Sequence, residues 1–397
     1  MIFHTSFLLC ENNLVIVNWY GIDLNIKYDF SFEELNSALD IEEPYPQRID
    51  YISEELDDLQ IQSLINTFSK ISKEYRIHGY SYFLLNENFV NAILHDFSKD
   101  KKTIFLWYLL KSAGYHAILL HNENDDIYLY GGIGQNVHNT NKVTVDGIQY
   151  ITIFEENKKL EKEKLFLYNK NNDKLRTSKL FDVDKSNLPI VGESVVNNKI
   201  EFIFKGNKFC YSYKLNKHIV DYYEAMPDID WDETYINYEY SVFLRSTLLP
   251  LLQKDIVVFS EVEKIQFLLS FVQKGIKYKE DSLVDNNERW MFPEESLMVG
   301  IADCEDKSIL FASLVKKILG INSILLFYDL KNDLKDHVNI AINVRNSISS
   351  SGWESVFFKG KDYVVCETSG EDYGIGENIK IDNLPTPLIY PLFSDKF

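Results

Sequence analysis

The segment from Asp303 to Gly320 constrains the fold most, because it has the features of a capped, buried helix. Apolar side chains recur along it at four-residue spacing, at Leu310, Leu314 and Ile318. Asp303 is suited to the N-cap, and Gly320 supplies the stop with which many helices end. We therefore expect a buried helix with Cys304 at or beside its first residue.

Two predicted strands follow this helix. Apolar residues alternate with polar or small ones from His337 to Val344, so the histidine lies at the start of the first strand. The second strand, Tyr363 to Glu367, ends in a carboxylate. If the two strands pair antiparallel, Glu367 can accept a hydrogen bond from one imidazole nitrogen of His337 while the other nitrogen faces Cys304.

This arrangement predicts a nucleophilic thiol. The exposed N–H groups and the positive dipole end at a helix start favour thiolate and can stabilise an oxyanion. Glu305 and Asp306 add negative charge and oppose ionisation, so a neighbouring imidazolium from His337 is needed. With that imidazolium, we expect the pKa of the Cys304 thiol to lie below its ordinary value.

Each of these residues taken alone has a more ordinary interpretation. A single cysteine near a helix start and a single strand histidine are most often structural, and a glutamate that ends a strand is usually solvated. The prediction of a catalytic site depends on the order of these residues along the chain.

That order, with the local sequence, resembles the bacterial transglutaminase-like superfamily, which is similar in architecture to papain-type thiol proteases. The resemblance covers about 150 residues and is carried by 289–311 (RWMFPEESLMVGIADCEDKSILF), 336–338 (DHV) and 363–368 (YVVCET). It implies that Cys304 is the nucleophile, His337 the general base and Glu367 the orienting carboxylate. Ala302 departs from the glycine that commonly precedes Asp-Cys in the family.

Two further residues near these motifs have candidate roles. The resemblance implies that Trp290 lines the acyl-binding groove or donates its indole N–H to the oxyanion, although an aromatic residue in a loop is more often a packing lid. Cys366 is next to Glu367 but on the opposite face of its strand, so we interpret it as a core residue and not as a second nucleophile.

A weaker copy of the same pattern occurs earlier in the chain. A shift of 206 residues aligns Gly114 with Gly320 and 118–120 (ILL) with 324–326 (ILL), and it sets Ser98 under Cys304. At a slightly longer shift, Phe154 aligns with Glu367. We infer a degenerate second copy of the fold, with coincidence between two helix–glycine–strand segments as the alternative.

We therefore predict an α+β protein with three segments: a degenerate transglutaminase-like domain at 1–160, a β-sandwich spacer at 161–241 and a transglutaminase-like catalytic domain at 242–397. In both transglutaminase-like domains, helices should pack on an antiparallel sheet. The spacer is expected because short runs such as 199–204 (KIEFIF) alternate between turn residues.

Composition limits the partners. The chain has 41 basic and 60 acidic residues and a formal charge of −19, which repels phosphate backbones and anionic lipids. We expect neither a nucleic-acid partner nor a membrane span. The expected partner is a peptide or protein substrate. The four cysteines are scattered and form no C-x-x-C pair, which argues against a zinc site and against disulfides. The spacing of Asp329, Asp333 and Asp336 does not match a calcium-binding loop. No metal or cofactor is therefore predicted.

The favoured function is a cysteine peptidase or amidase that forms an acyl-enzyme on Cys304. Two alternatives stay open: an acyl-transferase that passes the acyl group to an amine, and a protein-binding scaffold with an idle site. Met1 to Cys10 lacks the pattern of a secretory signal, so a complete chain would be cytoplasmic, and a processed one periplasmic or extracellular.

Overall fold

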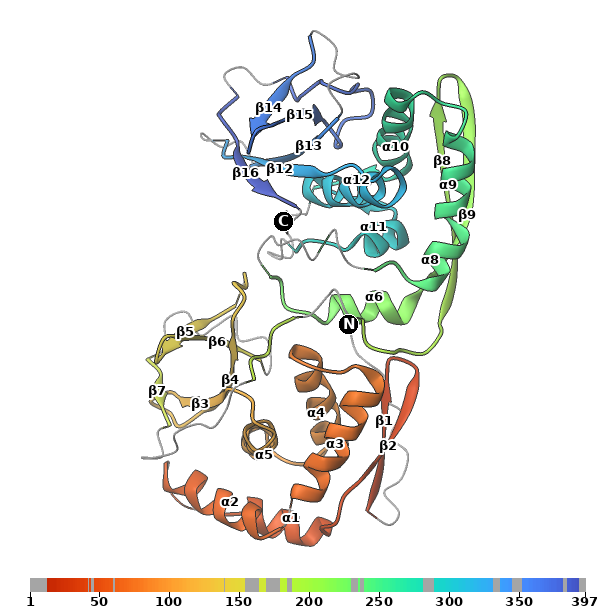
Figure 1. Cartoon of the computed structure of the whole chain (residues 1–397). Coiled ribbons are helices and arrows are strands. Elements are labelled where there is room, and N and C mark those ends of the chain that lie inside the picture. Colours follow the sequence, from red (N-terminus) through yellow and green to blue (C-terminus); the bar gives the residue numbers. More distant parts are fainter. Residues whose placement is uncertain are drawn as a thin grey trace. The chain divides into compact units, whose positions relative to one another are not determined.

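The chain forms an α+β protein in the computed structural model (Figure 1). The structure describes all residues except 1–12, 42, 44–45, 60, 139, 154–163, 169–178, 184–187, 230–234, 236–238, 281–288, 331–335, 345–351, 381–383 and 393–397. It divides into two compact units, the first made of 1–192 and 226–230 and the second of 193–225 and 231–397.

The first unit begins with an antiparallel hairpin, continues through helices and ends in a five-stranded antiparallel sheet. The hairpin strands are β1 (Leu14–Trp19) and β2 (Ile22–Lys27). The helices are α1 (Phe32–Leu39), α2 (Gln47–Asp58), α3 (Gln62–Tyr75), α4 (Tyr80–Ile93) and α5 (Lys99–Ser112). The sheet contains β3 (Ala117–His121), β4 (Ile127–Ile133), β5 (Lys142–Val145), β6 (Ile148–Thr152) and β7 (Phe166–Leu167).

The second unit has the same sequence of parts. Its hairpin strands are β8 (Val195–Phe204) and β9 (Asn207–Asn216). Its helices are α6 (Lys217–Glu224), α8 (Val242–Thr247), α9 (Leu249–Ile256), α10 (Glu261–Gly275), α11 (Pro293–Val299) and α12 (Cys304–Leu319). A short parallel pair, β10 (Lys277–Tyr278) and β11 (Ile301–Ala302), lies just before α12. The main sheet contains β12 (Ser323–Tyr328), β13 (His337–Ile342), β14 (Ser355–Phe358), β15 (Lys361–Cys366) and β16 (Leu388–Pro391).

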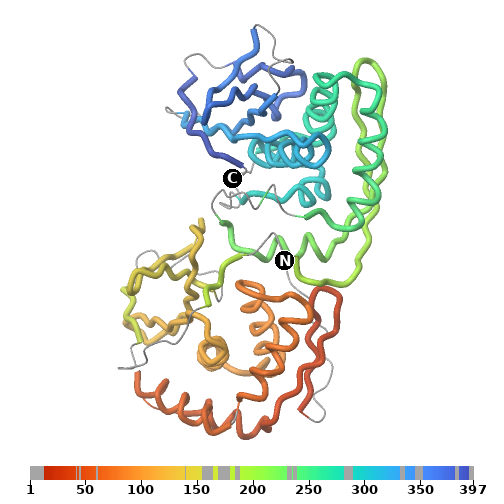
Figure 2. Tube along the Cα trace, viewed as in Figure 1, coloured from red at the N-terminus to blue at the C-terminus, as the bar shows by residue number. Residues whose placement is uncertain are grey.

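The two main sheets have equivalent strand orders, β5-β6-β4-β3-β7 in the first unit and β14-β15-β13-β12-β16 in the second. Each is entered from a helix that ends near a glycine with positive φ, Gly114 or Gly320. The first strand after that helix begins at Ala117 in one unit and Ser323 in the other, which is the same shift of 206 residues as in the sequence. The trace can be followed through both sheets in Figure 2.

The expected β-sandwich spacer at 161–241 is wrong for the residues that the structure describes. β7 belongs to the sheet of the first unit, where it pairs with β3. The alternating runs farther along form the two-stranded ribbon of β8 and β9 in the second unit, and α6 follows it. Alternation indicates only that one face of a strand is buried, and here a helix covers that face in place of a second sheet.

The ribbon is buried against α10 through aromatic rings. Phe202 and Phe204 contact Phe267 with ring centroids 5.1 and 5.3 Å apart, both edge to face. Farther along α10, Gly275 approaches Ile200 so closely that a Cβ there would lie 2.5 Å from the isoleucine side chain. The ribbon and α10 therefore form one packed layer that continues into the helix α12.

The sheet of the second unit brings the site residues together through its register. His337 is opposite Tyr328 across β12 and β13, and Ile340 is opposite Cys366 across β13 and β15. Since side chains alternate along a strand, His337 and Asn339 share one face, and Glu367, which follows Cys366, extends from that same face. The helix α12 packs against β12 and β13.

Candidate active site

Cys304 is the first residue of α12 and is nearly buried, with 7% of its surface exposed. The carboxylate of Asp303 caps the helix by accepting a hydrogen bond from the backbone N–H of Asp306, at 3.3 Å. The first N–H groups of a helix have no partner inside the helix. The helix therefore begins at Cys304, as the sequence predicts, and its first N–H groups belong to the same turn as the thiol.

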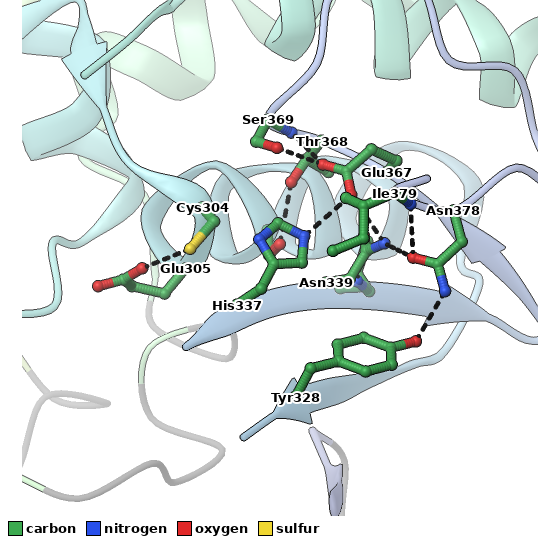
Figure 3. Close-up of polar contacts among 12 residues, drawn as sticks. Cys304, Glu305, Tyr328, His337, Asn339, Glu367, Thr368, Ser369, Asn378 and Ile379 are labelled. Carbon is green, nitrogen blue, oxygen red and sulfur yellow. Dashed lines mark hydrogen bonds and ion pairs between the residues drawn. The ribbon is translucent and has the colours of Figure 1, made fainter. Parts of the chain in front are cut away.

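His337 begins β13, and its ring stacks on that of Tyr328 with centroids 6.3 Å apart. Nε2 of His337 lies 2.9 Å from Oε2 of Glu367, and both side chains are buried. Figure 3 shows the imidazole between the sulfur of Cys304 and the carboxylate of Glu367, with its second ring nitrogen on the side of the sulfur.

Glu367 is fully buried and surrounded by hydrogen-bond donors. Besides His337, Nδ2 of Asn339 donates to Oε2 at 3.1 Å, and the backbone N–H and hydroxyl of Ser369 both donate to Oε1. Burial alone would raise the pKa of this carboxyl group. The hydrogen bonds and the charge of His337 outweigh burial and lower the pKa below its ordinary value.

An ionised Glu367 fixes the tautomer of His337. A carboxylate only accepts hydrogen bonds, so Nε2 of the neutral imidazole must carry the hydrogen. Nδ1 then presents its lone pair on the side where Cys304 lies (Figure 3). This is the orientation that a general base for the thiol requires.

The thiol itself is hydrogen-bonded to a neighbouring carboxylate. Among the described residues its hydrogen bond goes to Oε2 of Glu305, at 3.1 Å, and not to His337. Burial raises the pKa of the Cys304 thiol well above its ordinary value, and the charges of Glu305 and Asp303 raise it further. This is opposite to the direction expected from the sequence, because the helix start is covered and the nearest charges are negative.

Trp290 lies in the loop before α11 and is half-buried, with its ring 6.0 Å from that of Tyr235. The loop is tied to the start of α12, because the backbone N–H of Met291 donates to Oδ1 of Asp306 at 2.7 Å. Trp290 is thus in a segment attached near Cys304, and its predicted role in the acyl groove stays a prediction. Cys366 is fully buried, and its thiol contacts the carbonyl oxygen of Val364 in its own strand.

Several polar residues around the site were missed from the sequence. Asn339 and Ser369 each lie two residues from a predicted site residue, so the strand pattern placed them close without assigning them a role. Gln273 of α10 donates to the backbone carbonyl of Glu367 at 2.6 Å. Lys307, with no exposed surface, donates to the carbonyl of Gln273 at 3.1 Å, and burial lowers the pKa of its amine to about 8.

The corresponding positions of the first unit hold different chemistry. Ser98 is the N-cap of α5, so it has the place of Asp303 and not that of Cys304 at the backbone level. When the register is continued one residue beyond β4, the residue equivalent to His337 is Asp126, which accepts a hydrogen bond from Asn122 at 2.8 Å. Phe154, aligned with Glu367, lies outside the described residues.

Comparisons with known proteins give no assignment. No family model, no curated protein and no solved structure matches the chain. Within the described part of the chain, no group of three or more His, Cys, Asp or Glu side chains is arranged to hold a metal ion. The described helices include none that is long and apolar enough to cross a membrane.

Proposed function

We propose that the second unit is a thiol hydrolase of the transglutaminase-like kind, a cysteine peptidase or amidase that acts on peptide or isopeptide amides. The observation that carries the proposal is the buried hydrogen bond between His337 and the carboxylate of Glu367, at 2.9 Å, next to a cysteine at the start of a helix. A buried carboxylate is costly to desolvate, so its location beside a histidine and a cysteine favours a role in chemistry over a role in stability.

In this mechanism, Nδ1 of His337 takes the proton of the Cys304 thiol as the sulfur attacks the carbonyl carbon of an amide. The carbonyl electron pair moves to oxygen, and backbone N–H groups at the start of α12 stabilise the oxyanion. The imidazolium then gives its proton to the leaving amine, and a thioester to Cys304 remains. Water, activated by His337, hydrolyses the thioester and restores the thiol. Throughout, Glu367 keeps the imidazole oriented.

A catalytically idle binding scaffold is the second candidate, favoured by the state of the thiol. A buried thiol that donates to Glu305 and has a raised pKa is poorly nucleophilic until its surroundings change. Substrate binding would have to move the thiol from Glu305 towards His337. Transfer of the acyl group to an amine shares the first half-reaction with hydrolysis and is separated from it only by the products.

Alkylation against pH tests the proposed chemistry. Iodoacetamide labelling should be mapped by mass to Cys304 and to Cys210, which is exposed and serves as the internal reference. If the thiol leaves Glu305 for His337 in solution, as the hydrolase requires, Cys304 should react at lower pH than Cys210, and His337→Ala should slow its reaction by about tenfold. Glu367→Gln should leave the thiol present but place an amide N–H among donors, which misorients the imidazole.

The outcome decides between the two candidates. If Cys304 reacts no faster than Cys210, or is indifferent to His337, the scaffold is the better assignment. If Cys304 reacts faster than Cys210 and depends on His337, a second experiment separates hydrolysis from transfer. The protein is incubated with a diverse peptide pool, with and without an amine acceptor, and the products are identified by mass.

A further inference from the structure

A chain of buried amide side chains lies behind the His337–Glu367 pair (Figure 3). We propose that Asn378 is a positioning residue for the site, acting on Glu367 through Asn339. The inference rests on the proposed function for its catalytic meaning, but its structural content can be tested separately. Asn378 touches neither His337 nor Cys304 by any hydrogen bond between described residues, and no pattern in the sequence indicates it.

The connections are direct and short. Nδ2 of Asn339 donates both to Oε2 of Glu367, at 3.1 Å, and to Oδ1 of Asn378, at 2.8 Å. Nδ2 of Asn378 in turn donates to the hydroxyl of Tyr328, at 2.9 Å, and to Oε1 of Glu354, at 2.8 Å. Asn339 and Asn378 are both buried. Asn378 therefore contacts the neighbour of Glu367 and also Tyr328, whose ring stacks on His337.

The hydrogen-bond directions in this chain are determined from one end. Oδ1 of Asn378 accepts from the backbone N–H of Ile379, at 2.9 Å, and a backbone N–H can only donate. Its amide nitrogen faces the carboxylate of Glu354, which can only accept when ionised. The orientation of the Asn378 amide is thus fixed on both sides.

That orientation supports the orientation of Asn339, whose own Oδ1 accepts from the backbone N–H of Ile340 at 2.8 Å. Oδ1 of Asn378 can only accept, so the NH₂ group of Asn339 faces it, and the second N–H of the same group reaches Glu367. If the Asn339 amide were flipped, its oxygen would face both the oxygen of Asn378 and the Glu367 carboxylate. Asn378 therefore helps to hold a donor on Oε2 of Glu367, the same oxygen that faces Nε2 of His337, and so helps to align the carboxylate with the imidazole.

The backbone that carries Asn378 is itself held against the sheet. The N–H of Gly376 donates to the carbonyl of Val365 at 2.7 Å, and the carbonyl of Gly376 accepts from the N–H of Glu354 at 2.9 Å. The N–H of Ile375 donates to the side chain of Gln266 at 3.0 Å. Asn378 is thus presented by a fixed segment, as a positioning residue requires.

The test compares Asn378→Ala, Asn339→Ala and the double variant in the full chain. Asn343→Ala is the matched control, because Asn343 also makes a side-chain hydrogen bond, to the carbonyl of Asp362 at 2.9 Å, but has no link to the dyad. The first readout is the pH midpoint of Cys304 alkylation. The second is the low-field proton resonance of the His337 ring N–H, assigned by its loss in His337→Ala.

We expect Asn378→Ala to slow Cys304 alkylation at neutral pH by about fivefold, the size expected when one ordinary hydrogen bond is lost. The midpoint should move to higher pH, because a misaligned imidazolium stabilises the thiolate less. The ring N–H should exchange faster with solvent. The double variant should resemble Asn339→Ala alone, because Asn378 acts through Asn339. Asn343→Ala should change none of these.

Other results overturn the inference. An unchanged ring N–H resonance in Asn378→Ala, or effects of the two single variants that add in the double variant, would show that Asn378 is only a packing residue. If Cys304 proves unreactive in the parent chain, the proposed hydrolase fails while the resonance still decides the role of Asn378. Should the alanine variant not fold, Asn378→Asp combined with Glu354→Gln keeps the oxygen that accepts from Asn339 without placing two carboxylates in contact, and it should retain the ring N–H.

Discussion

Glu294, in the first turn of α11, is a carboxyl group with no exposed surface. Burial raises its pKa to about 7, although the backbone N–H of Ser241 donates to Oε1 at 2.5 Å and works in the opposite direction. The folded state therefore holds a proton on Glu294 that the unfolded chain loses near its ordinary value of 4.5. The folded state binds more protons between these two pKa values, and stability falls as pH rises through that window.

We predict that Glu294→Gln removes this slope. The amide oxygen of glutamine still accepts from Ser241, and the penalty for a buried charge above pH 7 disappears. Thermal unfolding followed from pH 4.5 to 8 should show a variant that is more stable than the parent at the upper end and similar at the lower end. Glu224→Gln, at an exposed position, is the control. If Glu294→Gln leaves the dependence of stability on pH unaltered, the pKa of Glu294 is not raised by burial.

At the scale of single elements, the start of α12 combines two effects that work against each other. Asp303 stabilises the helix by capping it, and its charge raises the pKa of the Cys304 thiol. A cap needs a side-chain oxygen but no charge, since asparagine caps helices as well as aspartate does. The two effects can therefore be separated.

We predict that Asp303→Asn keeps the cap and speeds Cys304 alkylation at neutral pH, because a negative charge beside the thiol is removed. Asp303→Ala should lose the cap and cost about 1 kcal/mol of unfolding free energy. Chemical denaturation and mapped alkylation measure the two effects on the same samples. Equal stability of the two variants would mean that the cap contributes little to stability. Equal alkylation rates in the parent and Asp303→Asn would mean that the charge of Asp303 has little effect on the thiol.

At the scale of the whole molecule, the second unit has its own core. Its sheet encloses a cluster of buried residues, and its ribbon packs on α10 through aromatic contacts. The repeated strand order in the first unit indicates that hairpin, helices and sheet together form one structural module. The ribbon should be an essential part of that module, since it covers one face of α10.

We predict that a fragment spanning 193–397, which includes the five residues 226–230 assigned to the first unit, unfolds cooperatively and alkylates Cys304 as the full chain does. A matched fragment that begins at Lys217 lacks the ribbon, exposes Phe267 and Phe271 of α10, and should lose cooperative unfolding. Circular dichroism and calorimetry compare the two. If the longer fragment fails to fold, the second unit depends on the first for its stability.

Much of this architecture could be predicted from local pattern. The helix that carries Cys304, its Asp303 cap, its Gly320 stop and the two strands that follow are in the structure where the sequence predicts them. The shift of 206 residues correctly indicated a second sheet entered from a similar helix. These features follow from backbone preferences and from apolar periodicity, both of which act over a few neighbouring residues.

Periodicity failed where the identity of the covering element mattered. An alternating strand is half-buried whether a sheet or a helix lies on it, so the ribbon of β8 and β9 was mistaken for part of a sandwich. The expected boundary at residue 160 was wrong for the same reason, because β7 completes a sheet that begins well before it. Strand partners are chosen by tertiary contacts that no local window contains.

The sequence by itself determined the candidate residues Cys304, His337 and Glu367 and the order of the elements that carry them. Tertiary structure alone decided their state: the hydrogen bond from the buried thiol to Glu305, the hydrogen-bond donors around Glu367, and the hydrogen bond between Asn339 and Asn378. The physical reason is that ionisation and orientation depend on desolvation and on hydrogen-bond partners contributed by distant segments. Spacing along the chain fixes which groups can meet, and only the packed fold fixes how each one is charged and held.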